Sequence, residues 1–307
     1  MKLSIIVPCY NEAQVLPLFF DEVQTHAALT NCKIEYVFVN DGSSDATLDV
    51  LKQFKKTCQS DIHIVDFSRN FGKEAGILAG LTESTGDLVV IMDADLQDPP
   101  SLLPQMVDIM NQDEYDSVAT YRVNRTGEPP IRSYFARQFY KLINRISDVD
   151  IVDGARDYRM MSRTMVDSIL SLHEYHRFSK GIFSWVGFKT KYIEFQNIER
   201  AAGETKWNFW KLVKYAIEGI VAFTTVPLRS SIFFGFIFSI FAFGYMIFVI
   251  VKAALYGDPV AGYPSMMAII LFLGGIQLLS LGVLGEYLAK TYLEVKNRPH
   301  YIVRKRY

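Results

Sequence analysis

The chain has 307 residues, of which 32 are basic and 33 acidic, so its formal net charge is −1. This balance excludes the global positive field that recruits nucleic acid, and any affinity for an anionic partner must come from a local patch. The three cysteines show no CxxC spacing and no clustered histidines. They argue against a structural zinc site or a disulfide framework and fit a reducing compartment.

Short apolar runs alternate with helical patterns along the first part of the chain. Continuous runs of β-branched and aromatic residues that end in polar clusters are typical of central strands buried on both faces. The alternation predicts an α/β fold with a doubly wound, mostly parallel sheet and ligands at the carboxyl ends of its strands. The predicted strands are 4–7, 36–39, 63–67, 88–92 and 116–121, and the predicted helices are 13–28, 45–57, 73–84 and 101–115.

Two carboxylates, Asp93 and Asp95, follow the fourth predicted strand. Side chains two residues apart on an extended chain point to the same side, so this pair could hold one hard divalent cation through oxygen. Such a cation keeps coordination positions open for a substrate diphosphate, which makes nucleotide chemistry the first expectation. Residues 40–45, taken alone, are typical of a turn followed by a helix cap. They follow a predicted parallel strand, however, and so lie at the same edge of the sheet as Asp93 and Asp95, which makes them a candidate binding loop.

The last third of the chain contains two segments without charged residues, 230–251 and 263–285. Each can cross a hydrocarbon core of ~30 Å, which takes ~20 helical residues. The preceding segment 207–229 combines tryptophan, tyrosine and lysine, as interfacial helices do. Basic residues on both flanks predict cytoplasmic termini, and glycines in the second segment would permit helix packing, including a homo-oligomer. A buried pair of core helices is the alternative.

Six motifs follow one another along the chain, namely Val7–Glu12, Val39–Asp45, Arg69–Lys73, Met92–Pro99, Asp157–Arg163 and Gly203–Trp207. They resemble the successive signatures of family 2 glycosyltransferases with the GT-A fold. They most resemble the polyprenyl-phosphate sugar transferases, which include dolichyl-phosphate mannose synthase and bacterial glucosyl transferases acting on undecaprenyl phosphate. The resemblance implies a metal-dependent, inverting transfer of one hexose, glucose from UDP-glucose, to polyprenyl phosphate at the cytosolic face of the plasma (inner) membrane. The resemblance covers about the whole chain.

The resemblance also implies roles for individual residues. Asp93 and Asp95, with Gln97 nearby, would hold Mg²⁺ or Mn²⁺ against the donor diphosphate. Asp95 and Asp157 would be the catalytic residues, with Asp157 at the position of the family's catalytic base. The nucleotide-binding residues would be Pro8, Tyr10, Asn11, Glu12, Asp41, Arg69, Lys73 and Asp93.

The chemistry of the acceptor leaves the role of Asp157 open. A phosphate monoester has a second pKa near ~6 and is largely dianionic at neutral pH, so it needs little help from a general base. Asp157 would then orient the acceptor or a sugar hydroxyl, or repel water. Alternatively, it forms a structural ion pair with Arg156 or Arg159.

A lipid phosphate needs fixed cations near the bilayer surface, and arginine offers a planar fork for two phosphate oxygens. On a predicted helix over 131–145, basic side chains form one stripe, which suits a phosphate, a membrane surface or a solvated face. Related dolichyl enzymes carry a hydroxyl residue four positions after the arginine that matches Arg137, where this chain has Lys141. The candidate acceptor-phosphate residues are Arg122, Arg137, Lys141, Arg200 and Lys206.

The predicted layout is a cytosolic GT-A catalytic domain over 1–206, an interfacial segment over 207–229, a transmembrane hairpin over 230–286 and a basic cytosolic tail over 287–307. Three alternatives remain. One is a GDP-mannose-dependent polyprenyl-phosphate mannosyltransferase. Another is a processive polysaccharide synthase, which would carry a QxxRW motif and further spans that this sequence lacks. The third is a non-catalytic membrane subunit, against which the three aspartates 93, 95 and 157 argue.

Overall fold

The computed structural model describes residues 1–122, 144–145, 152, 154–195, 224–256 and 262–307, and every structural statement below concerns these residues. Their contacts form two compact units, Met1–Ala216 with Arg298–Tyr307, and Ile217–Asn297. Each unit is described by itself. Several predicted features lie outside the described residues, namely residues 131–143 of the basic helix, residues 207–223 of the interfacial segment, and Arg137, Lys141, Arg200 and Lys206.

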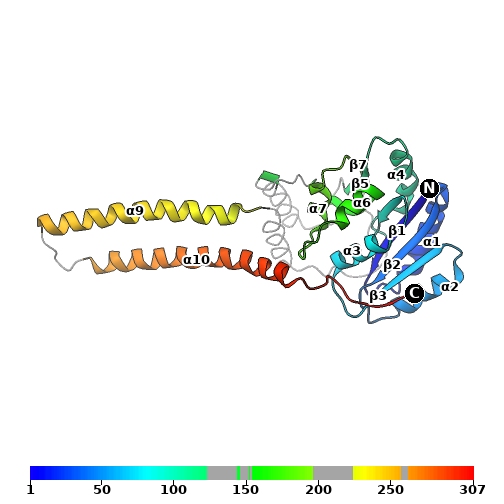
Figure 1. The fold of residues 1–307 in the computed structure, drawn as a ribbon, viewed down its shortest axis with the longest axis horizontal. Coiled ribbons are helices and arrows are strands. Elements are labelled where there is room, and N and C mark those ends of the chain that lie inside the picture. Colours follow the sequence, from blue (N-terminus) through cyan, green and yellow to red (C-terminus); the bar gives the residue numbers. More distant parts are fainter. Residues whose placement is uncertain (123–143, 146–151, 153, 196–223, 257–261) are drawn as a thin grey trace. The chain divides into compact units, whose positions relative to one another are not determined.

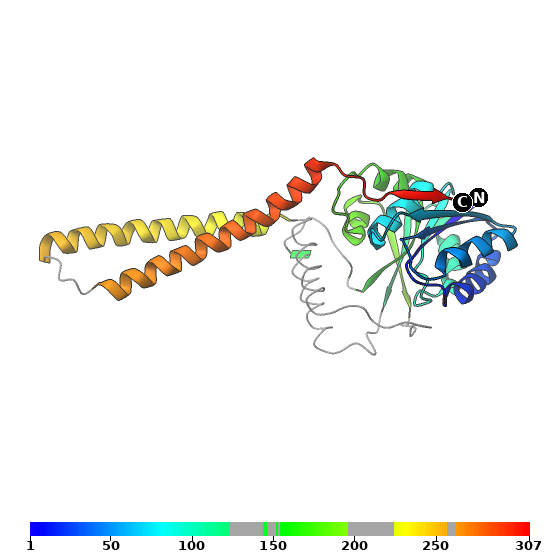
Figure 2. The same ribbon diagram turned by 90° about the horizontal axis from the view of Figure 1, so that it is seen from below.

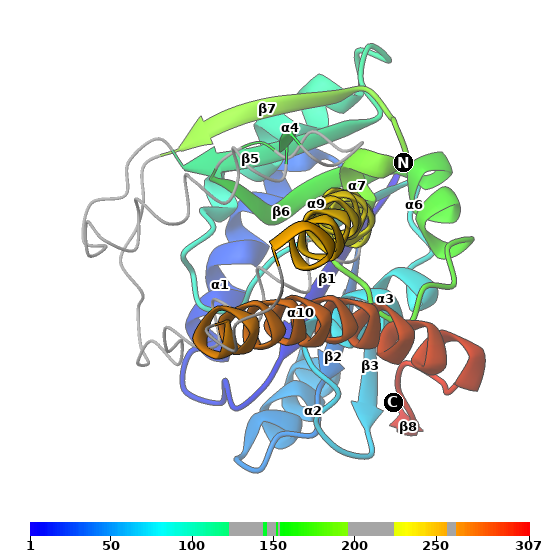
Figure 3. The ribbon, with the colours of Figure 1, turned by 90° about the vertical axis from the view of Figure 1, so that its left-hand side faces the viewer.

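The first unit is built on an eight-stranded sheet in the order β7-β5-β6-β4-β1-β2-β3-β8 (Figures 1 and 3). Its centre is parallel, because β1 pairs with β2 and β4, and β2 pairs with β3. β6 and β8 run antiparallel to their neighbours, so the sheet is mixed. The strands are β1 Lys2–Cys9, β2 Lys33–Asn40, β3 Asp61–Phe67, β4 Leu88–Ile91, β5 Ser117–Arg122, β6 Ala155–Ser162, β7 Thr190–Phe195 and β8 Val303–Arg306.

The α/β architecture predicted from the alternating pattern is confirmed. Each predicted strand and helix of the first 121 residues has its counterpart, whereas β6, β7, β8 and the helices α6 and α7 were not predicted. The helices are α1 Leu16–Ala27, α2 Thr47–Thr57, α3 Lys73–Glu83, α4 Leu103–Met110, α6 Arg163–Leu170 and α7 Ser179–Trp185, with short 3₁₀ turns η1 Ala28–Thr30 and η2 Pro100–Leu102.

The side chains of β1 alternate between two layers of helices. Leu3 and Ile5 belong to the larger core, together with Phe19 of α1 and Met106 of α4. On the opposite face, Ile6 meets α3, which can approach closely because it has a glycine at that point. Burial on both faces explains why the strand reads as an unbroken apolar run.

The second unit consists of two helices, α9 Val226–Tyr256 and α10 Tyr263–Lys296, which lie side by side as a hairpin (Figures 1 and 2). The ring of Phe238 meets that of Phe272 edge-on at 5.5 Å. Tyr287 Oη donates a 2.6 Å hydrogen bond to the carbonyl of Thr224. The hairpin therefore has cross-contacts near its middle and near its base.

Both helices contain segments long and apolar enough to cross a membrane, Val226–Tyr245 and Phe272–Lys296, with mean hydropathies of 1.7 and 1.4. None of either hydrophobic window is buried within the structure, which argues against the alternative of a core helix pair. Large apolar side chains lie on the surface instead, and Leu278, for example, is 72% exposed.

The predicted boundaries of the last segments need correction. α9 begins at Val226, inside the segment assigned to the interface, and α10 continues to Lys296 beyond the expected end near 285. The expected basic tail contains β8, which pairs with β3 in the sheet of the first unit. Three of the four residues of β8 are basic, and a charged edge strand needs only backbone pairing, so no hydrophobic pattern marks it.

Gly80 provides a test of the packing between α3 and β1. A Cβ added to Gly80 would overlap Ile6 Cγ2, so Gly80→Ala overpacks this contact. We expect a cost of about 1–3 kcal/mol, against a gain of about 1 kcal/mol in helix propensity, and hence a lower thermal unfolding midpoint in detergent. In an Ile6→Ala background the same substitution should become neutral or stabilising. Gly274→Ala, whose added Cβ meets open space, is the matched control; equal effects at both glycines would contradict the packing argument.

Candidate active site

The loops that follow β1 and β2 are joined by hydrogen bonds at the carboxyl edge of the sheet. The amide of Asn11 donates to Ser43 Oγ at 3.0 Å, and the amide of Ser44 donates to Asn11 Oδ1 at 2.8 Å. Asn11 adopts a left-handed backbone conformation with φ of 56°. The amide of Glu12 donates to Thr47 Oγ1 at 2.9 Å. Two predicted nucleotide-binding residues, Asn11 and Glu12, are thus fixed against the loop after β2.

Asp41 connects the loop after β2 to the loop after β3. Its carboxylate accepts hydrogen bonds from the amides of Phe71 at 2.6 Å and Gly72 at 2.9 Å. Burial raises the pKa of Asp41, and the two amide hydrogen bonds act in the opposite direction. The next residue, Gly42, has φ of 62°, and a Cβ there would overlap the backbone of Arg69, so a glycine is required. Asp41, one of the predicted nucleotide-binding residues, thus positions the loop that carries Arg69.

Lys73 lies at the centre of the site, between two carboxylates. Its Nζ is 2.8 Å from the carboxylate of Asp93 and 2.6 Å from Asp157 Oδ2. The antiparallel ladder of β4 and β6, with Ile91 opposite Arg159, brings the two acids to the same place. Burial lowers the pKa of Lys73, but the carboxylates of Asp157 and Asp93 outweigh it and raise the pKa.

The same contact decides the charge of Asp157. Burial raises the pKa of Asp157, but the charge of Lys73 outweighs it and holds the pKa below the ordinary range. Asp157 is therefore ionised at neutral pH. Arg156 pairs with Asp98, and the guanidinium of Arg159 lies 4.3 Å from the ring of Phe183. The alternative that Asp157 forms its ion pair with Arg156 or Arg159 is thus wrong.

A second ion pair flanks the first and was not predicted from the sequence. Arg156 Nε lies 3.0 Å from Asp98 Oδ1, and Arg156 Nη2 donates to Gln97 Oε1 at 3.4 Å. Burial raises the pKa of Asp98 to about 6, although the charge of Arg156 acts against this. The sequence offered only one indication of this pair, namely the position of its residues. Asp98 is the third acid after β4, and Arg156 directly precedes the candidate residue Asp157.

The predicted metal ligands lie in a turn rather than on a strand. β4 ends at Ile91, Asp95 Oδ1 accepts from the amide of Gln97 at 3.1 Å, and Leu96 has φ of 57°. The argument from an extended chain is therefore wrong for Asp95, because the chain has already turned. The donor set still fits a hard cation, since Asp93 and Asp95 offer carboxylate oxygens and the Asp93 side chain is 25% exposed.

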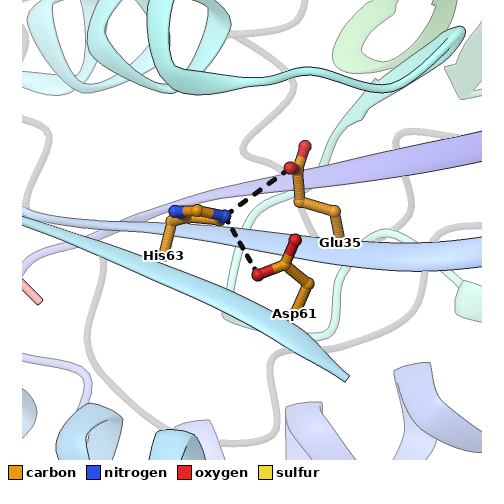
Figure 4. A group of neighbouring side chains, drawn as sticks. All are labelled: Glu35, Asp61 and His63. Atoms are coloured by element: carbon orange, nitrogen blue, oxygen red, sulfur yellow. Dashed lines mark ion pairs between the residues drawn. The ribbon is translucent and has the colours of Figure 1, made fainter.

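A different group of possible ligands, Glu35, Asp61 and His63, lies near the opposite ends of β2 and β3 (Figure 4). His63 Nε2 is 3.1 Å from Asp61 Oδ1 and 3.7 Å from Glu35 Oε1. Lys2 Nζ lies 2.5 Å from Glu35 Oε1 and 3.5 Å from Asp61 Oδ2. Because this cluster lies at the opposite edge of the sheet from the loops that carry the other candidate residues, we interpret it as a structural ion network and keep the predicted metal ligands after β4.

The remaining predicted residues border the same edge of the sheet. Pro8 is part of the end of β1, and Tyr10 follows it with 40% of its surface exposed. The guanidinium of Arg69 lies 4.2 Å from the ring of Phe71. Arg122 is the last residue of β5. The structure therefore brings Asp93 and Asp157 into contact with Lys73 and places the other described candidates on loops and strand ends along this edge of the sheet.

The mixed α/β sheet gathers acidic and basic side chains at the ends of its strands, as expected for the GT-A fold that the motifs predicted. The chain belongs to glycosyl transferase family 2, whose pattern matches residues 4–170, as the sequence motifs predicted. It is 42% identical to the prophage bactoprenol glucosyl transferase homolog of Escherichia coli (strain K12), covering 99% of each chain. It is also 42% identical to the bactoprenol glucosyl transferase of Shigella phage SfX, covering 100% of each.

Among solved structures, a mannosyltransferase of Pyrobaculum calidifontis in complex with GDP-Man and Mn²⁺ is 16% identical. The match covers 93% of this chain and 86% of that chain with a TM-score of 0.46. The assignment to the family rests on the sequence similarity to glycosyl transferase family 2 and to the bactoprenol glucosyl transferases.

The Glu35 network predicts a pH dependence of stability. Burial raises the pKa of Glu35, but hydrogen bonds from Lys2, Ser4 and Thr85 outweigh it and lower the pKa from 4.5 to about 2. The stabilisation is therefore complete above pH 4.5 and is lost as the pH falls towards 2, on the order of 3 kcal/mol. Thermal unfolding between pH 7 and pH 3 should show a shallower decline for Glu35→Gln than for the wild type or for the exposed control Glu22→Gln. Parallel declines would contradict the assignment.

Lys73 is the residue whose loss should be most damaging to the site. In Lys73→Gln, Asp93 and Asp157 lose their shared cation and the site loses a fixed positive charge. We expect sugar transfer to fall by about 100-fold or more, as for the loss of other preorganised charges. Lys56→Gln, at an exposed position of α2, is the matched control and should keep full activity. Initial rates at saturating substrates are the measurement, and equal rates for both variants would refute a central role for Lys73.

Proposed function

We propose that the protein is a membrane-bound, metal-dependent, inverting glycosyltransferase that moves glucose from UDP-glucose to a polyprenyl phosphate. The observation that carries this proposal is the 42% identity to bactoprenol glucosyl transferases over the full length, the helical hairpin included. The contact of Lys73 with Asp93 and Asp157 supports it, because a fixed cation and two carboxylates lie together in the site where the donor diphosphate and the acceptor phosphate would bind.

The proposed reaction is a single displacement at the anomeric carbon. An oxygen of the lipid phosphate forms the new bond to this carbon, and the bond to the UDP oxygen breaks with its electron pair leaving on UDP. A divalent cation held by Asp93 and Asp95 would neutralise the departing diphosphate. Lys73 supplies a fixed positive charge beside these acids. The attacking phosphate is already ionised at neutral pH, so it needs no activation by a base. Positioning of the two substrates and electrostatic stabilisation of the leaving group therefore provide most of the rate acceleration.

Asp157 acts in this scheme as an orienting group. Its low pKa means that it carries no proton at neutral pH and can accept a hydrogen bond from a sugar hydroxyl. Lys73 restricts the movement of its carboxylate through the 2.6 Å contact. A general base is not needed for an acceptor with a second pKa near ~6.

The membrane assignment is part of the proposal. A single compact unit contains both Met1–Ala216 and Arg298–Tyr307, and these parts are joined by the pairing of β3 with β8. Because the hairpin lies between them in the chain, both of its ends must be on the same side of a bilayer, which requires an even number of crossings. The two apolar helices supply that number. The basic residues flanking them favour the cytoplasmic face of the inner membrane for the catalytic unit and both termini.

A donor screen tests the function. Purified protein in detergent is incubated with labelled UDP-glucose, other UDP-sugars or GDP-mannose, and a short polyprenyl phosphate. We expect a glucosylated lipid from UDP-glucose, its loss on addition of EDTA, and its recovery with Mg²⁺ or Mn²⁺. Asp95→Ala is the negative control and should reduce transfer by about 100-fold or more, since it removes a metal ligand. A mannosyl lipid would select the alternative donor, and no lipid product from any donor would refute the enzyme assignment.

A further inference from the structure

The carboxyl-terminal segment Arg298–Tyr307, which we call the strap, packs against the loop at residues 68–72 that connects β3 to α3. We propose that the strap holds this donor loop in the shape that binds the nucleotide-sugar, and that Tyr301 and Arg304 are positioning residues for donor binding. The inference rests on the proposed function and on the prediction that Arg69, on the loop, and Lys73, at the start of α3, bind the nucleotide.

The first connection is made by backbone pairing and one arginine. β8 pairs with β3, and the ladder shifts register between Asp66 and Phe67. Beyond the shift, the amide of Ser68 donates to the carbonyl of Ile302 at 2.9 Å. Arg304 spans this irregularity, because its Nη2 donates to the carbonyl of Ser68 at 3.0 Å and its Nη1 lies 3.8 Å from Asp66 Oδ2. The first residue of the donor loop is therefore held from the strap by two hydrogen bonds.

The second connection is a row of aromatic rings. Tyr301 stacks on Phe67 with ring centroids 4.9 Å apart and an interplanar angle of 16°. Phe67 meets Phe71 edge-on at 5.7 Å, and Phe71 carries the guanidinium of Arg69 at 4.2 Å. Tyr301 of the strap thus supports Phe71 through the buried ring of Phe67, and Phe71 in turn contacts Arg69, a predicted nucleotide-binding residue. β3 and β8, which carry this contact region, lie side by side (Figure 3).

The third connection passes through buried polar groups. Asp66 is 1% exposed, and its Oδ1 accepts a 2.7 Å hydrogen bond from Asn40 Nδ2, while its other oxygen faces Arg304. Asn40 precedes Asp41, the residue whose carboxylate holds the amides of Phe71 and Gly72. The strap is therefore linked to both ends of the donor loop.

The strap also reaches the far end of the helix that begins with Lys73. Arg306 Nε lies 2.8 Å from Glu83 Oε1, at the last residue of α3. If β8 only covered the edge of the sheet, its backbone hydrogen bonds to β3 would be sufficient, and these side-chain contacts would not be needed. Contacts to the loop before α3 and to the end of α3 fix the helix and its first residue, Lys73, relative to the sheet.

The test uses the full-length protein in detergent or nanodiscs. We expect Tyr301→Ala and Arg304→Ala to raise the KM for the nucleotide-sugar by about tenfold, as small misplacements of binding groups do, and to weaken UDP binding in the presence of Mn²⁺ by the same factor. The KM for the polyprenyl phosphate should not change. Tyr301→Phe retains the ring and should restore donor binding. Lys305→Ala is the matched control, because this lysine lies over the Tyr307 ring, 4.8 Å from its centroid, rather than beside the donor loop.

Hydrogen exchange gives a readout independent of activity. The amides of Phe71 and Gly72 should exchange faster in Tyr301→Ala and Arg304→Ala than in the wild type or Lys305→Ala. A lower thermal midpoint with an unchanged donor KM would overturn the inference, because the strap would then contribute stability alone. A parallel rise of both KM values would overturn it as well. A wild type that binds no UDP would refute the proposed function together with the inference, whereas an active wild type with unaffected variants would refute the inference alone.

Discussion

The site depends on one ammonium group shared by two acids. Asp93 and Asp157 come from different elements, and without Lys73 their charges would repel each other in a partly buried place. The sheet is mixed at this point, because β6 runs antiparallel beside β4 and thereby brings Asp157 next to Asp93, two residues beyond the end of β4. The antiparallel pairing of β6 with β4 therefore determines which charged side chains meet in the site.

The parallel centre of the fold was predictable because each of its strands is buried on both faces and leaves a continuous apolar run in the sequence. β6 left no such trace. It carries Arg156, Asp157 and Arg159 within a strand that pairs on both sides, and Arg159 is 3% exposed with its guanidinium against the Phe183 ring. A buried cation that packs on an aromatic ring is indistinguishable in sequence from a solvated one, so the hydrophobic pattern fails there.

The acids of the site were recognised from motifs, but their partners were not. Lys73 and Asp157 are 84 residues apart, and nothing local relates them. The same holds for Asp41, whose position after β2 was predicted while its hydrogen bonds to the following loop were not. Motifs identify the residue types that the chemistry needs. The distances between them are set by strand pairing across the whole sheet, which a pattern in one segment does not contain.

The position of β8 in the chain adds a consequence for assembly. Its pairing with β3 joins residues on either side of the helical hairpin, and the contact of Arg304 with Ser68 spans 236 positions. The parallel centre can form from the first 91 residues, whereas the edge of β3 stays uncovered until the residues after the hairpin have been synthesised. Contacts this distant in sequence carry the largest loop-closure cost and are made late. The order of the chain thus places completion of the sheet after synthesis of both apolar helices.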